Sequence, residues 1–200
     1  MRTILILFAH PALEKSQVNR ALLRATEGLP FVTVNDLYEV YPDFEIDVDR
    51  EQALLLAHDY VLMQHPFYWY SAPPIIKQWE DLVLEHGWAY GRTGKALAGK
   101  NMMNVITTGG QQTAYQPTGF NRFSIREFLR PFEQTAVLCN MTYLPPFVVH
   151  GTHRITPEQT DSYVEYYRAL LTGLGEGRIQ PDQLTAFTYT NEYLIPFPIV

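Results

Sequence analysis

Three short segments of this chain combine residue types that could bind a flat, charged ligand. Residues 10–19 contain imidazole, hydroxyl and amide side chains from His10, Ser16 and Asn19. Residues 65–74 read HPFYWYSAPP and crowd aromatic rings and prolines together. Residues 107–110 read TTGG, and paired glycines let backbone amides approach a ligand closely. Together these segments offer an anion site beside an aromatic wall.

The segment at residues 10–19 favours binding of a phosphate group. Ser16 stands where a helix is expected to begin, and the free amides and positive dipole of a helix N-terminus attract anions. The side chains of Ser16 and Asn19 and a ring nitrogen of His10 would add hydrogen bonds. Alternatively, Ser16 serves only as a helix cap and His10 only ends a strand. The segment has neither G-x-G-x-x-G nor G-x-x-x-x-G-K-[ST] spacing.

The aromatic segment and the Gly-Gly segment fit the two needs of an isoalloxazine ring. Such a ring packs against an apolar or aromatic wall, and backbone donors along its polar edge stabilise its reduced anion. The alternatives are a buried aromatic loop that plugs one end of the core and a plain Gly-Gly turn. Because both segments follow predicted strands on one edge of a sheet, the ligand-binding interpretation is favoured.

The elements that must position these segments alternate along the chain. Short apolar runs rich in β-branched residues predict strands at residues 3–9, 31–35, 60–64, 101–107 and 142–150, the last interrupted by Pro145 and Pro146. Longer helical patterns predict helices at residues 16–27, 49–57, 74–85, 122–137 and 157–171. This alternation is typical of βαβ units around a parallel sheet.

The predicted fold is an α/β, flavodoxin-like three-layer sandwich over residues 1–174. Its five-stranded parallel sheet should have the strand order 2-1-3-4-5, which places a ligand at the carboxyl edge near the first and third strands. The loops after strands one, three and four are the three segments described above. The fold therefore predicts that they meet.

Residues 175–200 are predicted to form a C-terminal extension beyond the sandwich. Its last part contains the aromatic residues Phe187, Tyr189, Tyr193 and Phe197. Such a tail needs an apolar surface, either on its own domain or on a second subunit. We predict that it wraps around a homodimer, and a loosely ordered end is the alternative.

Composition limits the classes of protein to consider. The formal net charge is -6 and no cluster of lysine and arginine is present, which argues against a nucleic-acid partner. The single cysteine, Cys139, excludes an intrachain disulfide and a cysteine-built metal site. No metal is expected, because the histidines do not show a recurring metal-ligand spacing. We interpret four of them as structural or surface residues: His58, His86, His150 and His153.

A cytoplasmic location is expected. No segment approaches the roughly 18 to 20 uninterrupted apolar residues that span a bilayer, so direct membrane insertion is not predicted. The apolar start of the chain is too short for a secretion signal, and His10-Pro11 follows it instead of a small-residue cleavage site.

Several ordered motifs resemble one family. They are His10-Pro11 with Ser16 and Asn19, the aromatic segment with Gln64 before it, HGWAYG at residues 86–91, TTGG at residues 107–110, and LPPF at residues 144–147. Over roughly residues 1–173 the chain resembles the NAD(P)H:quinone oxidoreductase family of flavodoxin-fold enzymes. It is most similar to the short bacterial members that are ancillary proteins of glutathione-gated potassium-efflux antiporters.

The resemblance implies roles for individual residues. The flavin phosphate and ribityl region would be held by His10, Ser16, Gln17, Val18 and Asn19. The flavin ring would pack on and hydrogen-bond Phe67, Tyr68, Trp69 and Tyr70. Its polar edge would be completed by Thr107, Thr108, Gly109 and Gly110. A substrate pocket at a dimer interface would be lined by Trp88 and Tyr90.

Tyr115 matches the catalytic tyrosine of the family, which hydrogen-bonds the reduced flavin. The larger animal enzymes have a histidine six residues further on, and Asn121 stands at that position here. Asparagine can donate a hydrogen bond but cannot supply a proton near neutral pH, so a strict tyrosine-histidine relay is not expected. Tyr115 and Asn121 are the catalytic candidates.

The expected activity is two-electron, ping-pong hydride transfer from NADPH or NADH through a flavin to a quinone by a homodimer. FMN is favoured over FAD because the short bacterial relatives are the most similar. The alternative is a regulatory subunit that docks on a potassium-efflux antiporter at the inner membrane, with redox turnover incidental. A one-electron flavodoxin is disfavoured because Trp88, Tyr90 and Tyr115 indicate a substrate pocket.

Overall fold

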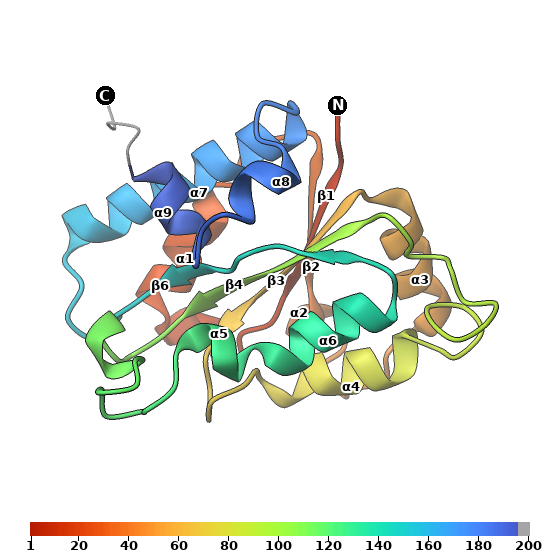
Figure 1. The fold of residues 1–200 in the computed structure, drawn as a ribbon, viewed down its shortest axis with the longest axis horizontal. Coiled ribbons are helices and arrows are strands. Elements are labelled where there is room, and N and C mark those ends of the chain that lie inside the picture. Colours follow the sequence, from red (N-terminus) through yellow and green to blue (C-terminus); the bar gives the residue numbers. More distant parts are fainter. Residues whose placement is uncertain (196–200) are drawn as a thin grey trace.

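The structure is a computed structural model that describes residues 1–195; residues 196–200, with Phe197, lie outside the described part. Its centre is a parallel sheet in the order β2-β1-β3-β4-β5, with β6 also paired to β4 (Figure 1). The strands are β1 (Ile4–Phe8), β2 (Val32–Asp36), β3 (Tyr60–Pro66), β4 (Asn101–Thr107), β5 (Thr142–Tyr143) and β6 (Phe147–Val149). The predicted flavodoxin-like order is confirmed.

Burial on both faces explains the apolar strand sequences. Every residue of β1, β3 and β4 is buried, as expected for parallel strands that helices cover on both sides. The fifth predicted strand is split into β5 and β6, which both pair with β4 in parallel. Pro145 and Pro146 lie between them and have no amide hydrogen to donate to the ladder.

Helices form the outer two layers. They are α1 (Gln17–Arg24), α2 (Leu37–Val40), α3 (Val48–Ala57), α4 (Pro74–Val83), α5 (Ile125–Phe128), α6 (Arg130–Leu138), α7 (Pro157–Gly175), α8 (Pro181–Leu184) and α9 (Thr190–Leu194), with 3-10 turns η1 (Leu13–Lys15) and η2 (Gln112–Ala114). One hydrophobic cluster joins the sheet to α3, α4 and α6, and a second joins it to α1 and α7. Figure 1 shows these helices on opposite faces.

The prediction of one helix over residues 122–137 is wrong. Arg122 has a φ of 62°, which no helix accommodates, and Ser124 caps α5 in a reciprocal box with Glu127. The helix then breaks at Leu129, and α6 begins with Pro131 in its first turn. The break turns α5 toward the loop that carries Tyr115.

Helix α7 continues past its predicted end at residue 171. It runs through two glycines that pack closely instead of ending the helix. A Cβ at Gly173 would lie 2.4 Å from Cδ1 of Ile179, and one at Gly175 would lie 2.2 Å from a ring carbon of Phe31. These glycines let Phe31 and Ile179 pack tightly on the helix, although they weaken its intrinsic propensity.

The C-terminal extension packs on its own domain as far as it is described. Leu184 and Leu194 are buried in the cluster that α1 and α7 share. The backbone N–H of Thr190 donates to the Pro146 carbonyl over 3.0 Å. The alternative of a loosely ordered end is therefore wrong for residues 175–195, while wrapping around a second subunit stays a prediction.

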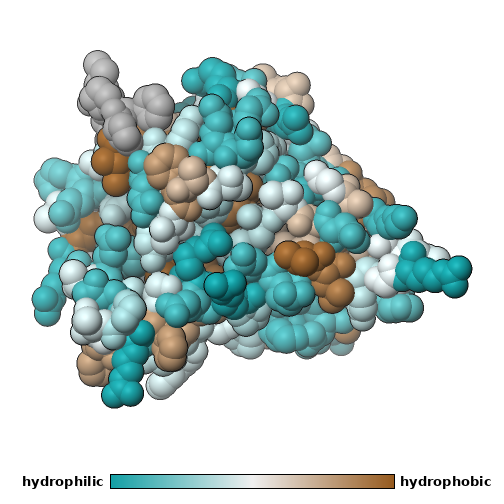
Figure 2. All heavy atoms as spheres, in the orientation of Figure 1, coloured by the Kyte–Doolittle hydropathy of each residue, from teal (hydrophilic) through white to brown (hydrophobic). Residues whose placement is uncertain are grey.

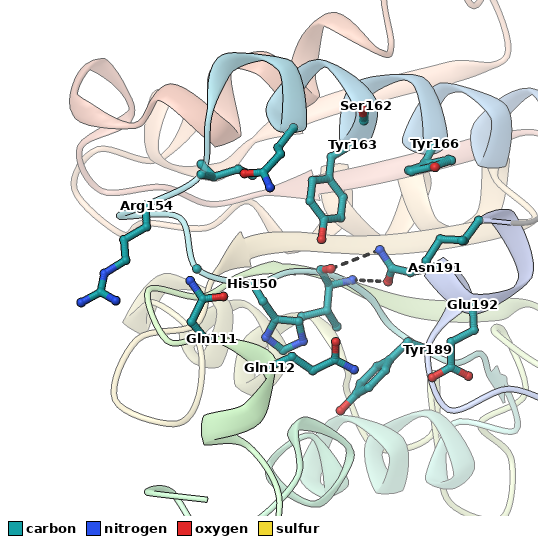
Figure 3. A pocket seen from close by; sticks show the side chains of 15 residues that line it. Gln111, Gln112, His150, Arg154, Ser162, Tyr163, Tyr166, Tyr189, Asn191 and Glu192 are labelled. Carbon is teal, nitrogen blue, oxygen red and sulfur yellow. Dashed lines mark hydrogen bonds between the residues drawn. The ribbon is translucent and has the colours of Figure 1, made fainter. Parts of the chain in front are cut away.

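Asn191 binds the edge of the sheet. Its Oδ1 accepts from the Val148 N–H over 2.8 Å, and its Nδ2 donates to the Val148 carbonyl over 3.1 Å (Figure 3). One amide side chain thus makes the pair of bonds that a neighbouring strand would make. On the face drawn in Figure 2, which includes the extension, hydrophobic residues form separate patches among hydrophilic ones.

Candidate functional site

Most of the residues predicted to bind a cofactor meet at the carboxyl edge of the sheet. A cavity of about 590 Å³ there, here called the phosphate-end cavity, receives the loops after β1, β3 and β4. Its predicted members are His10, Ser16, Gln17, Val18, Asn19, Phe67, Tyr68, Thr107 and Gly109, and it also contains Ala12, Lys15, Pro66, Thr152 and His153. The fold therefore brings the first segment to the other two.

The N-terminus of α1 is tied to the end of β4 by side chains. Ser16 caps the helix, accepting from the Asn19 N–H over 3.3 Å, and has the extended φ of −96° typical of a cap. The Asn19 amide nitrogen donates to Ser16 Oγ and to Thr107 Oγ1, each over 3.0 Å. Asn19 Oδ1 is buried without a hydrogen-bond partner among residues 1–195. A ligand hydroxyl that donates to this oxygen would satisfy it.

His10 is held as a neutral donor toward the cavity. Its Nδ1 accepts from the Ala12 N–H over 3.1 Å, which leaves the ring proton on Nε2. Burial lowers the pKa of His10 below the ordinary value, against the opposing effect of Glu14. The ring meets Tyr68 edge-on, with centroids 6.1 Å apart. His10 can therefore donate a neutral hydrogen bond to an anion.

A second cavity of about 480 Å³ adjoins the first, because Phe67 lines both. This ring-end cavity is lined by Phe67, Trp69, Tyr70, Gly110, Ala114, Tyr115, Phe120 and Asn121. The two catalytic candidates from the sequence therefore lie in the same cavity. Thr108 is buried just behind the wall, and its hydroxyl donates to the Gly110 carbonyl over 2.8 Å.

The aromatic segment makes a strained turn. The Ser71 N–H donates to the Tyr68 carbonyl over 2.9 Å, and the two residues between them, Trp69 and Tyr70, have φ values of 49° and 65°. Glycine or asparagine usually fills such positions, since bulky side chains there cost about 1–3 kcal/mol each. Trp69 is 93% exposed, so packing within this chain does not repay the strain.

Aromatic rings from the loop after β3 and from α5 surround Tyr115. Its ring lies edge-on to Phe67, with centroids 5.8 Å apart, and Phe128 of α5 stacks on Tyr70 at 5.1 Å. Gly110 makes room for it, because a Cβ there would lie 3.0 Å from Cε2 and 3.1 Å from the hydroxyl of Tyr115. Burial raises the pKa of Tyr115, and a hydrogen bond with Thr108 opposes the increase.

Asn121 faces a different tyrosine. The hydroxyl of Tyr70 lies 3.5 Å from Asn121 Oδ1, and the Asn121 backbone N–H donates to the Ala114 carbonyl over 2.9 Å. The side chain thus closes the rim of the ring-end cavity beside Tyr115. Asn121 therefore fits the role of a polar residue in the wall of the ring-end cavity.

Trp88 and Tyr90 do not join this site within one chain. Helix α4 has ten residues and carries the chain about 15 Å away from Pro74 before their loop begins. The loop closes on itself, with the Gly87 N–H donating to the Tyr90 carbonyl over 2.8 Å. Tyr90 lines a separate cavity of about 410 Å³ that also contains residues of α4 and α6.

Three residues near the site were not predicted. Lys15 precedes Ser16 directly, so its charge beside a proposed phosphate was visible in the sequence. His153 packs on Gly109, where a Cβ would lie 2.5 Å from its Nε2. The ring centroid of His150 lies 5.8 Å from that of Tyr115. Both histidines follow β6, and only the sheet order brings them to the other loops.

Residues 1–195 contain no group of three or more histidine, cysteine or acidic side chains able to hold a metal ion. In the same part of the chain, no helix is both long and apolar enough to cross a membrane.

The fold, the two cavities and the sequence agree on the class of protein. Residues 2–171 match a protein family described as having the flavodoxin-like fold. The chain belongs to this family, within its NAD(P)H:quinone reductase group. It is 48% identical over 164 residues to the glutathione-regulated potassium-efflux system ancillary protein KefG of Serratia proteamaculans, covering 82% of this chain and 90% of that protein.

Two solved structures are also similar. The general stress protein 14 of Treponema denticola, in complex with FMN, is 40% identical with a TM-score of 0.82, covering 86% of this chain and 99% of that one. An NADPH-quinone reductase from P. pentosaceus is 34% identical with a TM-score of 0.77, covering 84% and 96%. The family match ends at residue 171, before the C-terminal extension.

Proposed function

We propose that this protein is an FMN-dependent NAD(P)H:quinone oxidoreductase. The adjoining phosphate-end and ring-end cavities carry this proposal, because one offers anion donors and the other an aromatic wall with a tyrosine hydroxyl. The FMN complex of the Treponema denticola protein and the name of the P. pentosaceus reductase support it. Bound FMN would supply the redox chemistry, accepting hydride from NADPH or NADH and delivering two electrons to a quinone.

The residues of the phosphate-end cavity fit FMN. Ser16, the Nε2–H of His10, the charge of Lys15 and the amides at the start of α1 would hold the phosphate. The unpartnered Asn19 Oδ1 would accept from a ribityl hydroxyl. The other cofactor-binding residues given above would line the path from the phosphate to the ring.

The ring-end cavity would orient the cofactor and exclude water. Phe67 and the Trp69-Tyr70 turn would form an apolar wall, and the backbone of Gly109 and Gly110 would face the polar edge. The hydroxyl of Tyr115 would hydrogen-bond the reduced ring. NAD(P)H and the quinone would use this cavity in turn, which gives ping-pong kinetics.

A homodimer is part of the proposal. Trp69 is 93% exposed and Phe120 is 89% exposed at the mouth of the ring-end cavity, so a second surface is needed to cover them. Trp88 and Tyr90 of a second copy would line the substrate pocket from the other side. Analytical ultracentrifugation of the holoprotein tests this arrangement, and a monomer with full activity would contradict it.

The visible spectrum of purified protein, before and after anaerobic addition of NADPH or NADH, tests the cofactor and the donor together. We expect a bound flavin that mass spectrometry identifies as FMN, and bleaching of its absorbance by the nicotinamide. Added quinone should then restore the oxidised spectrum. Protein that binds no flavin and oxidises no NAD(P)H after reconstitution would overturn the proposal.

The KefG relative favours a second function for the same chain, as an ancillary subunit of a potassium-efflux antiporter. The protein would then dock from the cytoplasm on the inner membrane. Co-purification with the antiporter and reduced potassium efflux in a deletion strain are the expected results. A deletion strain with unchanged efflux would contradict this function without affecting the enzymatic one.

A further inference from the structure

A further cavity lies beside the site, between the loop after β6, α7 and the C-terminal extension (Figure 3). Its volume is about 570 Å³, close to the 590 Å³ of the phosphate-end cavity. Part of its wall comes from Tyr189, Asn191 and Glu192 of the extension, and the family match ends before them, at residue 171. This cavity, here called the extension cavity, therefore needs residues that the matched part of the chain does not supply.

Three consecutive residues of the loop after β4 line three different cavities. Gly109 lines the phosphate-end cavity, Gly110 the ring-end cavity and Gln111 the extension cavity. His150 also lines the extension cavity, and its ring centroid lies 5.8 Å from that of Tyr115, which lines the ring-end cavity. The extension cavity is thus separated from the place proposed for the flavin ring by this loop and these two side chains.

Aromatic rings stand on both sides of the extension cavity. Figure 3 shows Tyr163 and Tyr166 of α7 on one side, and Gln112 and Tyr189 on the other. Tyr189 is buried, whereas Tyr163 and Tyr166 are half-buried, so part of each of these two side chains is open to solvent. Aromatic side chains of this kind give a flat heterocycle a surface on which to stack.

Polar side chains without partners line the same cavity. Within residues 1–195 the side-chain amides of Gln111 and Gln112 make no hydrogen bond, and the guanidinium of Arg154 makes neither a hydrogen bond nor an ion pair. An amide offers a donor beside an acceptor, which matches the amino group and the adjacent ring nitrogen of adenine. A quinone offers only acceptors and matches less well. A guanidinium is suited to a phosphate group.

We propose that the extension cavity binds an adenine nucleotide, with the adenine ring against Tyr166, its polar edge at the Gln112 amide and its phosphate at Arg154. In the proposed enzyme this nucleotide is the adenosine half of NADPH or NADH, and the nicotinamide half enters the adjoining ring-end cavity. The assignment to the hydride donor rests on the proposed function. The loop after β4 would then contact FMN on one side and the donor on the other.

Two substitutions test the cavity, and each has a matched control. Tyr166→Leu removes the stacking surface, whereas Tyr166→Phe keeps the ring and should behave like the wild type. Arg154→Gln removes the charge offered to the phosphate. Its control is Arg178→Gln, because Arg178 is an exposed arginine that pairs with Glu176 and lines none of the three cavities.

The first measurement compares NADPH and NADH with reduced nicotinamide mononucleotide, a donor that lacks the adenosine half. We expect KM for NADPH or NADH to rise by about tenfold in Tyr166→Leu and about fivefold in Arg154→Gln, with kcat and KM for the quinone unchanged. KM for the mononucleotide should stay the same in all four variants. A purely structural role for Tyr166 would instead affect both kinds of donor alike.

The second measurement is calorimetric titration of the protein with ADP in the presence of FMN. We expect ADP to bind in competition with NADH, and more weakly in Tyr166→Leu and Arg154→Gln than in the two controls. ADP binding of this kind without any NAD(P)H oxidation would contradict the proposed function and keep the nucleotide site.

Three results would overturn the inference and leave the proposed function in place. They are an unchanged KM for NADPH and NADH in Tyr166→Leu and Arg154→Gln, ADP binding that is absent or equal in these variants and the wild type, and ADP binding that does not compete with NADH.

Discussion

The two ends of the site each place a neutral histidine at the end of a strand, yet the two rings have opposite hydrogen-bonding patterns. His10, after β1, accepts from the Ala12 amide and keeps its proton on Nε2, facing the phosphate-end cavity. His150, after β6, has its Nδ1 3.4 Å from the Thr108 hydroxyl oxygen, whose own proton goes to the Gly110 carbonyl, so the ring proton is on Nδ1 and Nε2 has no partner among residues 1–195. The local partner of Nδ1, a backbone N–H in one case and a hydroxyl oxygen in the other, decides which nitrogen carries the proton.

This difference shows why burial alone does not reveal the role of a histidine. Burial lowers the pKa of both rings, and it also lowers that of His65 to about 4 inside β3. The nitrogens of His65 are both paired, with the Pro66 carbonyl at 2.9 Å and the Asn104 amide at 3.1 Å. His65 is thus a core residue, whereas Nε2 of His10 has no hydrogen-bond partner among residues 1–195 and His10 lines a cavity.

The largest expected effect is on the pH dependence of stability, through the titration of His150. The unfolded His150 titrates at its ordinary pKa of 6.5 and the folded one at about 4, so the unfolded chain binds more protons between these values. Stability should therefore fall as pH decreases from about 6.5 to about 4, by about 3 kcal/mol for this group. Urea unfolding across this range should show less pH dependence in His150→Asn. An identical pH slope in wild type and variant would contradict the assigned burial.

The phosphate end should respond most to Asn19→Ala. This change removes the bonds to Ser16 and Thr107 that join α1 to β4, and we expect FMN binding to weaken by about ten- to a hundredfold. Fluorescence titration with FMN measures this. Asn101→Ala, at the other end of β4, is the control that should leave FMN affinity unchanged. Equal losses in both variants would show a general destabilisation instead.

Gly109 of the phosphate-end cavity and Gly110 of the ring-end cavity should differ in how much an added methyl group destabilises the protein. Gly110→Ala would push on Tyr115, which Phe67 and Phe128 hold in place, and should cost about 1–3 kcal/mol in unfolding free energy. Gly109→Ala meets only the ring of exposed His153 and should cost less than Gly110→Ala. Thermal unfolding of both variants measures which one is less stable. A larger loss of stability in Gly109→Ala than in Gly110→Ala would contradict the prediction that Tyr115 is held more rigidly than His153.

The smallest expected effect is a gain in stability. Trp69→Gly relieves a positive φ at an exposed residue and should raise the free energy of unfolding by about 1 kcal/mol, while weakening FMN binding. Trp88→Gly, where the φ is not positive, should bring no gain. If Trp69→Gly is destabilised as well, the turn at Tyr68–Ser71 is held by contacts of Trp69 itself.

The sheet order and the phosphate end could be predicted from sequence because their signals are local. Apolar runs marked the strands, and the strand-to-helix step at Ser16 marked the candidate anion site. The ring end depends on residues that are distant in the chain. His150 reaches Tyr115 only after β6 pairs with β4, and Tyr189 reaches His150 only after the extension folds back.

One difference from the sequence predictions has an identifiable cause. The positive φ of Arg122 keeps the predicted helix from starting at residue 122, so α5 begins only at Ile125, and a side-chain pattern does not reveal such a backbone angle. The placement of Trp88 and Tyr90 in a pocket at a dimer interface stays a prediction, because within one chain Tyr90 and Tyr115 line different cavities.

The bonds of Asn191 to Val148 also limit how copies of this protein can associate. An exposed strand edge can recruit a strand from another molecule, and such pairing leads to continuous sheets or aggregates. Here a side chain of the same molecule already occupies the N–H and the carbonyl of Val148 in β6. Two copies therefore cannot extend the sheet through Val148 unless the extension first detaches, which leaves the aromatic mouth of the ring-end cavity as the more accessible surface for self-association.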